Sequence, residues 1–200
     1  MKKFTVGDKV MHPQYGPGQI TGVEHRELVE GFEHYYVIEL LMDGSTLFIP
    51  MRNIEELGVR SVMSQARLTS VFDTLRGMPR RLSKDFKVRQ ARIRKKLATA
   101  RPIKLAEVVR DLTGRNRRSY LTKVDRALLD RGRELLAAEV AAVSGTEVIY
   151  AHQEMDAALK SATLDKEQEP ERRAAITPPR ESTRETLVEK LLKRVKQDAR

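Results

Sequence analysis

The first sixty residues contain short apolar runs separated by turn residues. Alternation of apolar and polar positions at period two is clearest from Tyr36 to Leu40, and glycine-containing pairs bound the runs. Asp43-Gly44 lies between two apolar runs and predicts a hairpin, because both residues tolerate a positive φ. Five short strands at this spacing predict a small SH3-like or Tudor-like β-barrel. An open meander packed on the next domain is the alternative.

After Gly58 the apolar residues recur at helical spacing instead, and the pattern predicts about five helices between residues 61 and 160. The first of these helices is expected to end at Gly77. Ser83 is the predicted N-cap of a long basic helix that runs to about Ala100. The predicted fold class is therefore α+β, with the small β-barrel followed by an all-α helical domain.

The later helices are delimited by capping residues and glycines. The next helix is expected to cover residues 103–113 and to end at Gly114. Thr122 is the predicted N-cap of a further helix, with Asp125 as the acid of a capping box. A break at Gly145 then precedes the last helix of the bundle.

The chain beyond residue 160 has a different composition. Residues 161–182 are mixed in charge and poor in large apolar groups, which predicts a flexible linker. Residues 183–200 regain an apolar stripe that includes Leu187 and Leu191, and this stripe predicts an amphipathic C-terminal helix. Self-association through residues 183–199 is one interaction that such a helix would permit.

Composition excludes several classes of protein. The chain has 200 residues, a formal net charge of +10 and no Cys, so disulfides, thiolate metal sites and cysteine nucleophiles are absent. No apolar run approaches the roughly 18 residues of a membrane span, and the first residues lack the apolar core of a signal peptide. We therefore expect a cytoplasmic protein without a membrane partner. A polyanion, most often nucleic acid, is the expected ligand.

The positive charge is concentrated in the helical region. Residues 1–60 have 6 basic and 9 acidic side chains, whereas residues 61–160 have 22 basic and 11 acidic side chains. Between Arg76 and Arg126 there are 18 basic side chains and only 4 acids. A solvated surface helix would explain a weaker bias, but this excess favours phosphate binding, because guanidinium groups bind phosphate through paired hydrogen bonds. Such contacts position a duplex and carry little sequence information.

The sequence contains no recognisable set of catalytic residues. The four histidines lack the spacing of metal ligands. The loop Gly16-Pro17-Gly18 has no following Lys-Ser/Thr pair, so it is better explained as a turn than as a phosphate cradle. No serine lies in a nucleophile-elbow pattern. We predict a protein that is not an enzyme, with no catalytic residue, no metal and no cofactor.

An ordered set of motifs extends over roughly residues 4–160. In the N-terminal region the motifs are VGDKV at 6–10, HP at 12–13, YVIE at 36–39 and IP at 49–50. In the helical region they are MPRR at 78–81, AEVVRDL at 106–112, LT at 121–122 and ELLAAE at 134–139. This set resembles the CarD/CdnL family of bacterial RNA polymerase-binding transcription regulators. The N-terminal domain of that family also occurs in the transcription-repair coupling factor.

The resemblance implies two functional halves. Residues 1–60 would form a Tudor-like domain that docks on the RNA polymerase β subunit, and residues 61–160 a basic helical domain that binds promoter double-stranded DNA and modulates open-complex stability. The implied polymerase contacts are Arg26, Phe48 and Pro50. With the charge pattern, the resemblance also implies DNA contacts at Arg80, Arg81, Leu82, Lys84, Lys87, Arg89 and Arg110.

Two positions depart from the family pattern. Leu82 stands where the family commonly has a Trp that wedges at the upstream fork, and Asp85 stands where a basic residue is usual. An aliphatic wedge can still enter a base step, although it stacks less well than an indole. A second hypothesis, of a different class, is a protein-interaction adaptor whose basic surface and C-terminal helix bind protein partners rather than DNA.

Overall fold

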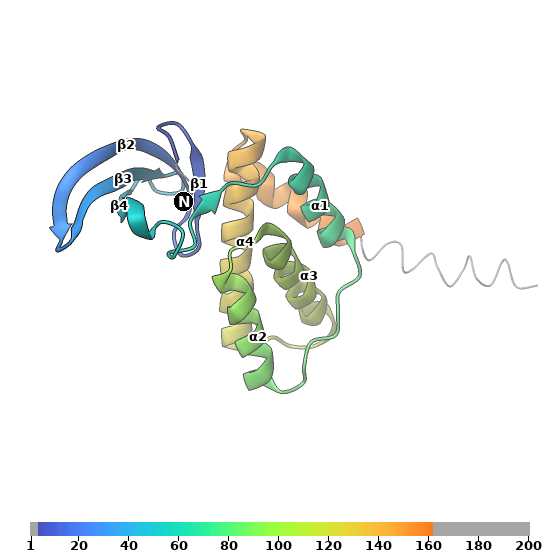
Figure 1. The fold of residues 1–200 in the computed structure, drawn as a ribbon. Coiled ribbons are helices and arrows are strands. Elements are labelled where there is room, and N and C mark those ends of the chain that lie inside the picture. Colours follow the sequence, from blue (N-terminus) through green and yellow to red (C-terminus); the bar gives the residue numbers. More distant parts are fainter. Residues whose placement is uncertain (1–3, 162–200) are drawn as a thin grey trace, which may run out of the picture. The chain divides into compact units, whose positions relative to one another are not determined.

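The computed structural model describes residues 4–161, which form an antiparallel sheet followed by a helical domain (Figure 1). The strands are β1 (Lys9–His12), β2 (Gly16–Val29), β3 (Phe32–Leu40), β4 (Thr46–Pro50) and β5 (Arg60–Ser61), with the 3-10 helix η1 (Met51–Asn53) after β4. The helices are α1 (Gln65–Arg76), α2 (Phe86–Ala98), α3 (Pro102–Arg118) and α4 (Lys123–Ser144), and a further helix covers residues 148–161. The predicted α+β fold class is confirmed.

The sheet has the strand order β4-β3-β2-β1-β5, so β4 and β5 are its outer strands. The predicted hairpin joins β3 to β4: Gly44 has a φ of 70°, and the amide of Ser45 donates to Asp43 Oδ1 at 3.0 Å. Gly18 lets β2 lie directly against β3, because a Cβ there would be 2.6 Å from Ile38 Cγ2. The core of this domain consists of Phe4, Val10, Ile20, Tyr36, Ile38, Ile49, Ile54 and Val59.

Helix α3 is the central element of the helical domain and packs against α1, α2 and α4. Its apolar face includes Leu105, Val109 and Leu112, which are fully buried at the helical spacing i, i+4, i+7. The predicted boundaries of α4 are confirmed: Thr122 Oγ1 accepts a hydrogen bond from the amide of Asp125 at 3.1 Å, and Gly145 ends the helix in the left-handed conformation. The cap at Thr122 and the left-handed Gly145 thus fix the two ends of α4.

The predicted start of α2 at Ser83 is wrong. Asp85 is the N-cap, because its carboxylate accepts hydrogen bonds from the amides of Lys87 (2.8 Å) and Val88 (3.4 Å). Lys84 therefore precedes the helix, and α2 ends at Ala98, slightly earlier than expected. The capping role also gives a structural reason for an acid at a position where the family pattern has a base.

The prediction that Gly114 ends α3 is also wrong, since the helix continues to Arg118. Gly114 is needed for close packing instead. A Cβ at this position would lie 2.3 Å from Pro79 Cβ, so only glycine lets the connection between α1 and α2 lie directly on α3. Gly114 is thus explained by its contact with Pro79, 35 residues earlier in the sequence, and not by the end of a helix.

A shielded ion pair joins β5 to α4. The fully buried carboxylate of Glu139 binds both terminal nitrogens of Arg60, at 2.6 and 2.9 Å, and accepts the amide of Met63 at 2.9 Å. Arg60 also donates to the carbonyl of Ala100, just before α3. These bonds hold β5 and Met63 against α4 and the connection between α2 and α3.

The predictions for residues 162–200 lie outside the described residues. They concern most of the linker, the C-terminal helix and its role in self-association, on which the adaptor hypothesis depends. Within residues 4–161, no helix is long and apolar enough to cross a membrane.

Candidate nucleic-acid interface

Most of the acidic side chains between residues 76 and 126, the basic segment of the sequence, are buried. Three of the four acids between residues 76 and 126 are buried, namely Glu107, Asp111 and Asp125, and the fourth, Asp85, caps α2. Burial alone would raise the pKa of Glu107, but hydrogen bonds and charge from Lys96 (2.8 Å) and Lys104 (3.1 Å) lower it below its usual value. Asp85 is therefore the one exposed acid between residues 76 and 126.

Arg89, which the sequence assigns to DNA contact, is a buried residue with an exposed fraction of 2%. Its guanidinium forms a two-pronged ion pair with Asp125, with Nη2–Oδ2 at 2.6 Å and Nε–Oδ1 at 3.2 Å. Its remaining nitrogen, Nη1, donates to the carbonyls of Ser83 (2.8 Å) and Lys84 (3.1 Å). Every nitrogen of the group thus has a partner inside the protein, so Arg89 holds the start of α2 in place and does not point to the surface.

The environment of Asp125 keeps this carboxylate ionised. Burial by itself would raise its pKa, but hydrogen bonds from Arg89 and Thr122 and the charge of Arg89 lower the pKa below its usual value. Asp125 is fully buried on α4, and Arg89 lies on α2, 36 residues earlier. The pair therefore fastens the first turns of α2 and α4 together.

Arg110 is the second predicted DNA contact that the structure places inside the protein. It has an exposed fraction of 7%, and its Nη2 lies 2.7 Å from Asp111 Oδ1. Asp111 Oδ1 also accepts the backbone amide of Arg80 at 2.9 Å. The pair of Arg110 and Asp111 therefore holds the segment before α2 on α3.

Leu82 is half-buried and packs against the core of the helical domain. A wedge that enters a base step has to be free at the surface. The position that corresponds to the family Trp is thus occupied by a side chain that anchors the α1–α2 connection.

The other four predicted DNA contacts are exposed: Arg80, Arg81 and Lys84 in the connection between α1 and α2, and Lys87 in the first turn of α2. The structure adds two exposed bases, Lys123 and Arg126, from the first turn of α4. Gln90 Nε2 lies 3.3 Å from Thr122 Oγ1, and Figure 1 shows the beginnings of α2 and α4 at one end of the helical domain. We call the six exposed bases the basic end: Arg80, Arg81, Lys84, Lys87, Lys123 and Arg126.

Sequence reasoning missed Lys123 and Arg126 because no local pattern joins them to α2. The sequence also contained a signal that Arg89 is not a DNA contact. Arg89, Ile93 and Leu97 are spaced four residues apart, which places Arg89 on the apolar face of α2. The surface charge of a helix is therefore best counted after its core face has been assigned.

The predicted polymerase contacts lie together at one edge of the sheet. The guanidinium of Arg26, on β2, lies 4.8 Å from the centre of the Phe48 ring, on β4, and also pairs with Glu24. Pro50 belongs to the same outer strand and is opposite Tyr35 of β3. Because β4 pairs only with β3 in the described sheet, its other edge is available for a further strand.

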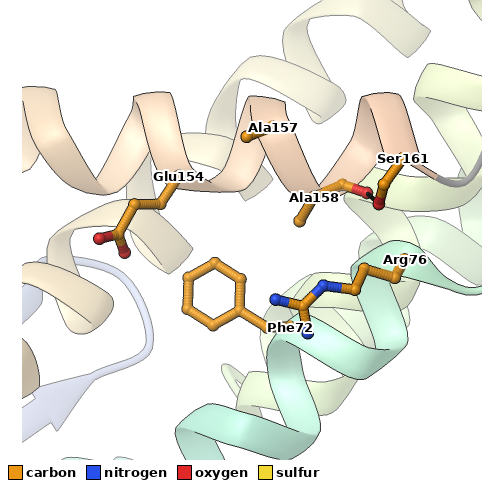
Figure 2. A pocket seen from close by; sticks show the side chains of 6 residues that line it. All are labelled: Phe72, Arg76, Glu154, Ala157, Ala158 and Ser161. Atoms are coloured by element: carbon orange, nitrogen blue, oxygen red, sulfur yellow. Dashed lines mark hydrogen bonds between the residues drawn. The ribbon is translucent and has the colours of Figure 1, made fainter.

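A shallow groove of about 510 Å³ lies between α1 and the helix over residues 148–161 (Figure 2). Its walls are mostly apolar, and the guanidinium of Arg76 lies over the ring of Phe72 with Glu154 on the facing helix. No nucleophile and base are paired there. Across residues 4–161, no group of three or more His, Cys, Asp or Glu side chains could hold a metal ion.

Comparison with known families agrees with this division into a sheet and a basic helical domain. Residues 4–63 match the CarD-like/TRCF RID domain, and residues 70–156 match the CarD C-terminal domain. The chain belongs to the CarD-like family. A relative from Bacillus subtilis (strain 168), named "Putative transcription factor YdeB", is 29% identical over 143 residues, which cover 71% of this chain and 93% of the relative. The family is one of transcription regulators rather than of enzymes.

Proposed function

We propose that this CarD-like transcription regulator docks on the RNA polymerase β subunit through the β4 edge and binds promoter duplex DNA through the basic end. The tethered contact would then modulate the stability of the open complex. One observation carries the proposal: the acids between residues 76 and 126 are buried or capping, while six bases remain exposed in the connection before α2 and in the first turns of α2 and α4.

The chemistry of the basic end suits phosphates of a duplex. Arg80 and Arg81 can each bind a phosphate through paired hydrogen bonds, and the lysines add point charges. Contacts of this kind hold a duplex without reading its bases, so we expect weak affinity and little sequence preference. If about five phosphates are neutralised, a fourfold rise in salt weakens binding by roughly several hundred-fold.

The sheet supplies the second contact. An open outer strand can bind a strand of a partner through main-chain hydrogen bonds, with side chains beside it adding specificity. The stacked pair of Arg26 and Phe48 lies at this edge and offers both a cation and an aromatic surface. Docking on polymerase would raise the effective concentration of the basic end at the promoter, which compensates for weak DNA affinity.

The DNA half is tested by fluorescence anisotropy of the full chain with a labelled blunt duplex at low and moderate salt. The double variant Lys84→Glu/Lys87→Glu should bind at least about tenfold more weakly and show a shallower salt dependence, since two phosphate contacts are lost. Arg67→Glu is the matched control, because Arg67 is an exposed base on α1 outside the basic end. Absence of duplex binding by the unaltered chain at low salt contradicts the DNA role.

The polymerase half is tested by capture of the purified β subunit on the immobilised full chain. Arg26→Glu should weaken capture and leave duplex binding unchanged, whereas Lys84→Glu/Lys87→Glu should do the reverse. These two variants are controls for each other. Equal capture by Arg26→Glu and the unaltered chain would show that the β4 edge is not the docking surface.

A further inference from the structure

The groove between α1 and the helix over residues 148–161 exposes apolar surface on the helical domain (Figure 2). The ring of Phe72 lies between the two helices, packs against the helical core and is only partly buried. On the facing helix, Ala157, Ala158 and Ser161 line the groove, and their small side chains let another helix approach closely. A groove of about 510 Å³ with these walls suits the apolar side of an amphipathic helix.

The two walls of the groove also carry opposite charges. Arg76 extends from α1, and Glu154 extends from the facing helix at the opposite end of the groove (Figure 2). Both side chains are exposed, and Nη1 of Arg76 lies 3.3 Å from Oδ1 of Asp73 on its own helix. A complementary helix therefore has an acidic flank toward α1 and a basic flank toward the helix over residues 148–161.

The sequence of residues 183–199 has this arrangement of side chains. In the amphipathic helix predicted there, the apolar stripe consists of side chains that share one side: Leu187, Val188, Leu191, Leu192 and Val195. At about 3.6 residues per turn, Glu185 and Glu189 border this stripe on one flank, beside Lys196. Lys190 and Arg194 border it on the other flank. The two acids and these two bases thus lie on opposite sides of the stripe, as the charges of the groove require.

The groove lies within reach of this segment. Ser161, which lines the groove, is the last described residue, and the predicted linker over residues 162–182 follows it. A flexible linker of that length has a root-mean-square span of about 25 Å, comparable with the length of the helix over residues 148–161, roughly 20 Å. Tethering at this distance gives an effective concentration on the order of millimolar, far above that of a second copy in dilute solution. The same chain is therefore the favoured source of the segment.

We propose that residues 183–199 dock as an amphipathic helix in the groove of their own chain. The apolar stripe would cover Phe72, while Glu189 pairs with Arg76 and Arg194 pairs with Glu154. The apolar stripe then has its partner inside the same molecule, in place of a second copy or another protein. This inference goes beyond the proposed function and does not depend on the binding of DNA or polymerase.

Disulfide cross-linking of the full chain tests the docking, because the unaltered chain has no cysteine. Ala157→Cys puts a thiol on the groove wall, and Leu192→Cys puts a second thiol on the apolar stripe. Under a mild oxidant this pair should close an intramolecular disulfide at least about tenfold faster than the matched control Ala91→Cys/Leu192→Cys. Ala91 is an exposed alanine on α2, outside the groove.

Two sets of substitutions, added to the cysteine pair of the groove, test the individual contacts. Leu187→Ser/Leu191→Ser removes much of the apolar stripe and should slow closure to the control rate. Arg76→Glu should slow closure about two- to fivefold, the effect of one exposed ion pair, and Glu189→Arg in addition should restore the rate. Substitutions in residues 183–199 change no residue of either core, so residues 4–161 keep their fold.

The outcomes are distinct. Equal closure rates for the groove pair and the control pair would overturn the docking. Disulfides that join two chains, at a rate that rises with protein concentration, would overturn it as well and assign the groove to a second copy. Failure of Glu189→Arg to restore the rate would overturn its pairing with Arg76. None of these outcomes bears on the proposed function, which is tested by duplex binding and by capture of the β subunit.

Discussion

Replacement of Arg89 tests whether a buried ion pair builds the basic end. Arg89→Met keeps the length of the aliphatic stem and removes the guanidinium. Asp125 then keeps its charge at 0% exposure without its main partner. Breaking a buried pair in this way costs about 3–5 kcal/mol, which is a large part of the stability of a small domain.

The size of the effect follows from the contacts. Arg89 makes two bonds to Asp125 and two to the carbonyls of Ser83 and Lys84. The double variant Arg89→Met/Asp125→Leu removes the lone charge, so it should recover most of the loss in the single variant. Part of the loss remains, about 1–3 kcal/mol, because the two carbonyls lose their donor.

The assay is urea unfolding followed by circular dichroism at neutral pH. Arg92→Met is the matched control, because Arg92 is exposed on the same helix and should change the free energy of unfolding by no more than about 0.5 kcal/mol. Under conditions where Arg89→Met is folded, its affinity for a blunt duplex should fall as well, since the segment that carries Lys84 is no longer held. A loss of stability below about 1 kcal/mol, the value of an exposed pair, would refute the reasoning.

Two further predictions concern packing and pH. Gly114→Ala should lower the free energy of unfolding by about 1–3 kcal/mol, because its Cβ would overlap Pro79, whereas Gly132→Ala, with its nearest contact at 3.4 Å, should be neutral or stabilising in thermal melts. Equal melting temperatures would contradict this. The pKa values of Asp125 and Glu107 are lowered by folding, so their contribution to stability is complete above about pH 5, where both groups are ionised in the unfolded chain as well, and is lost progressively as the pH falls below that. A urea midpoint that stays constant under acid conditions argues against it.

Local signals in the sequence predicted much of the fold. Asp43-Gly44 identified the β3–β4 hairpin, Thr122 the start of α4 and Gly145 its end, and all three are confirmed. These signals depend on the conformational preferences of one or two residues, so they can be recognised without knowledge of the neighbours. The predictions based on Ser83 and Gly114 were wrong for two different reasons. Asp85 caps α2 in place of Ser83, and Gly114 is required by its contact with Pro79 and not by the end of a helix.

The candidate site was predictable in part. Arg80, Arg81, Lys84 and Lys87 are exposed as the charge pattern requires, whereas Arg89 and Arg110 are inside the protein and Leu82 is half-buried. An excess of bases in a segment predicts a polyanion, because the net charge of a surface depends little on the path of the chain. Which of those bases reach the surface depends on the acids that pair with them inside the protein: Asp125 of α4 for Arg89, and the adjacent Asp111 for Arg110.

By itself, the sequence determined the α+β class, the family and the segment that carries the positive charge, because these depend on periodicity, motif order and composition. Only the tertiary structure decided how the charges divide between interior and surface. Asp125 and Arg89 are 36 residues apart in the sequence and form an ion pair in the folded protein. In the protein interior, where the dielectric constant is low, either charge alone would be strongly destabilising, so each is stable there only when it is paired with the other. This buried pair joins the first turns of α2 and α4, so the exposed Lys87 of α2 comes to the same end of the domain as Lys123 and Arg126 of α4.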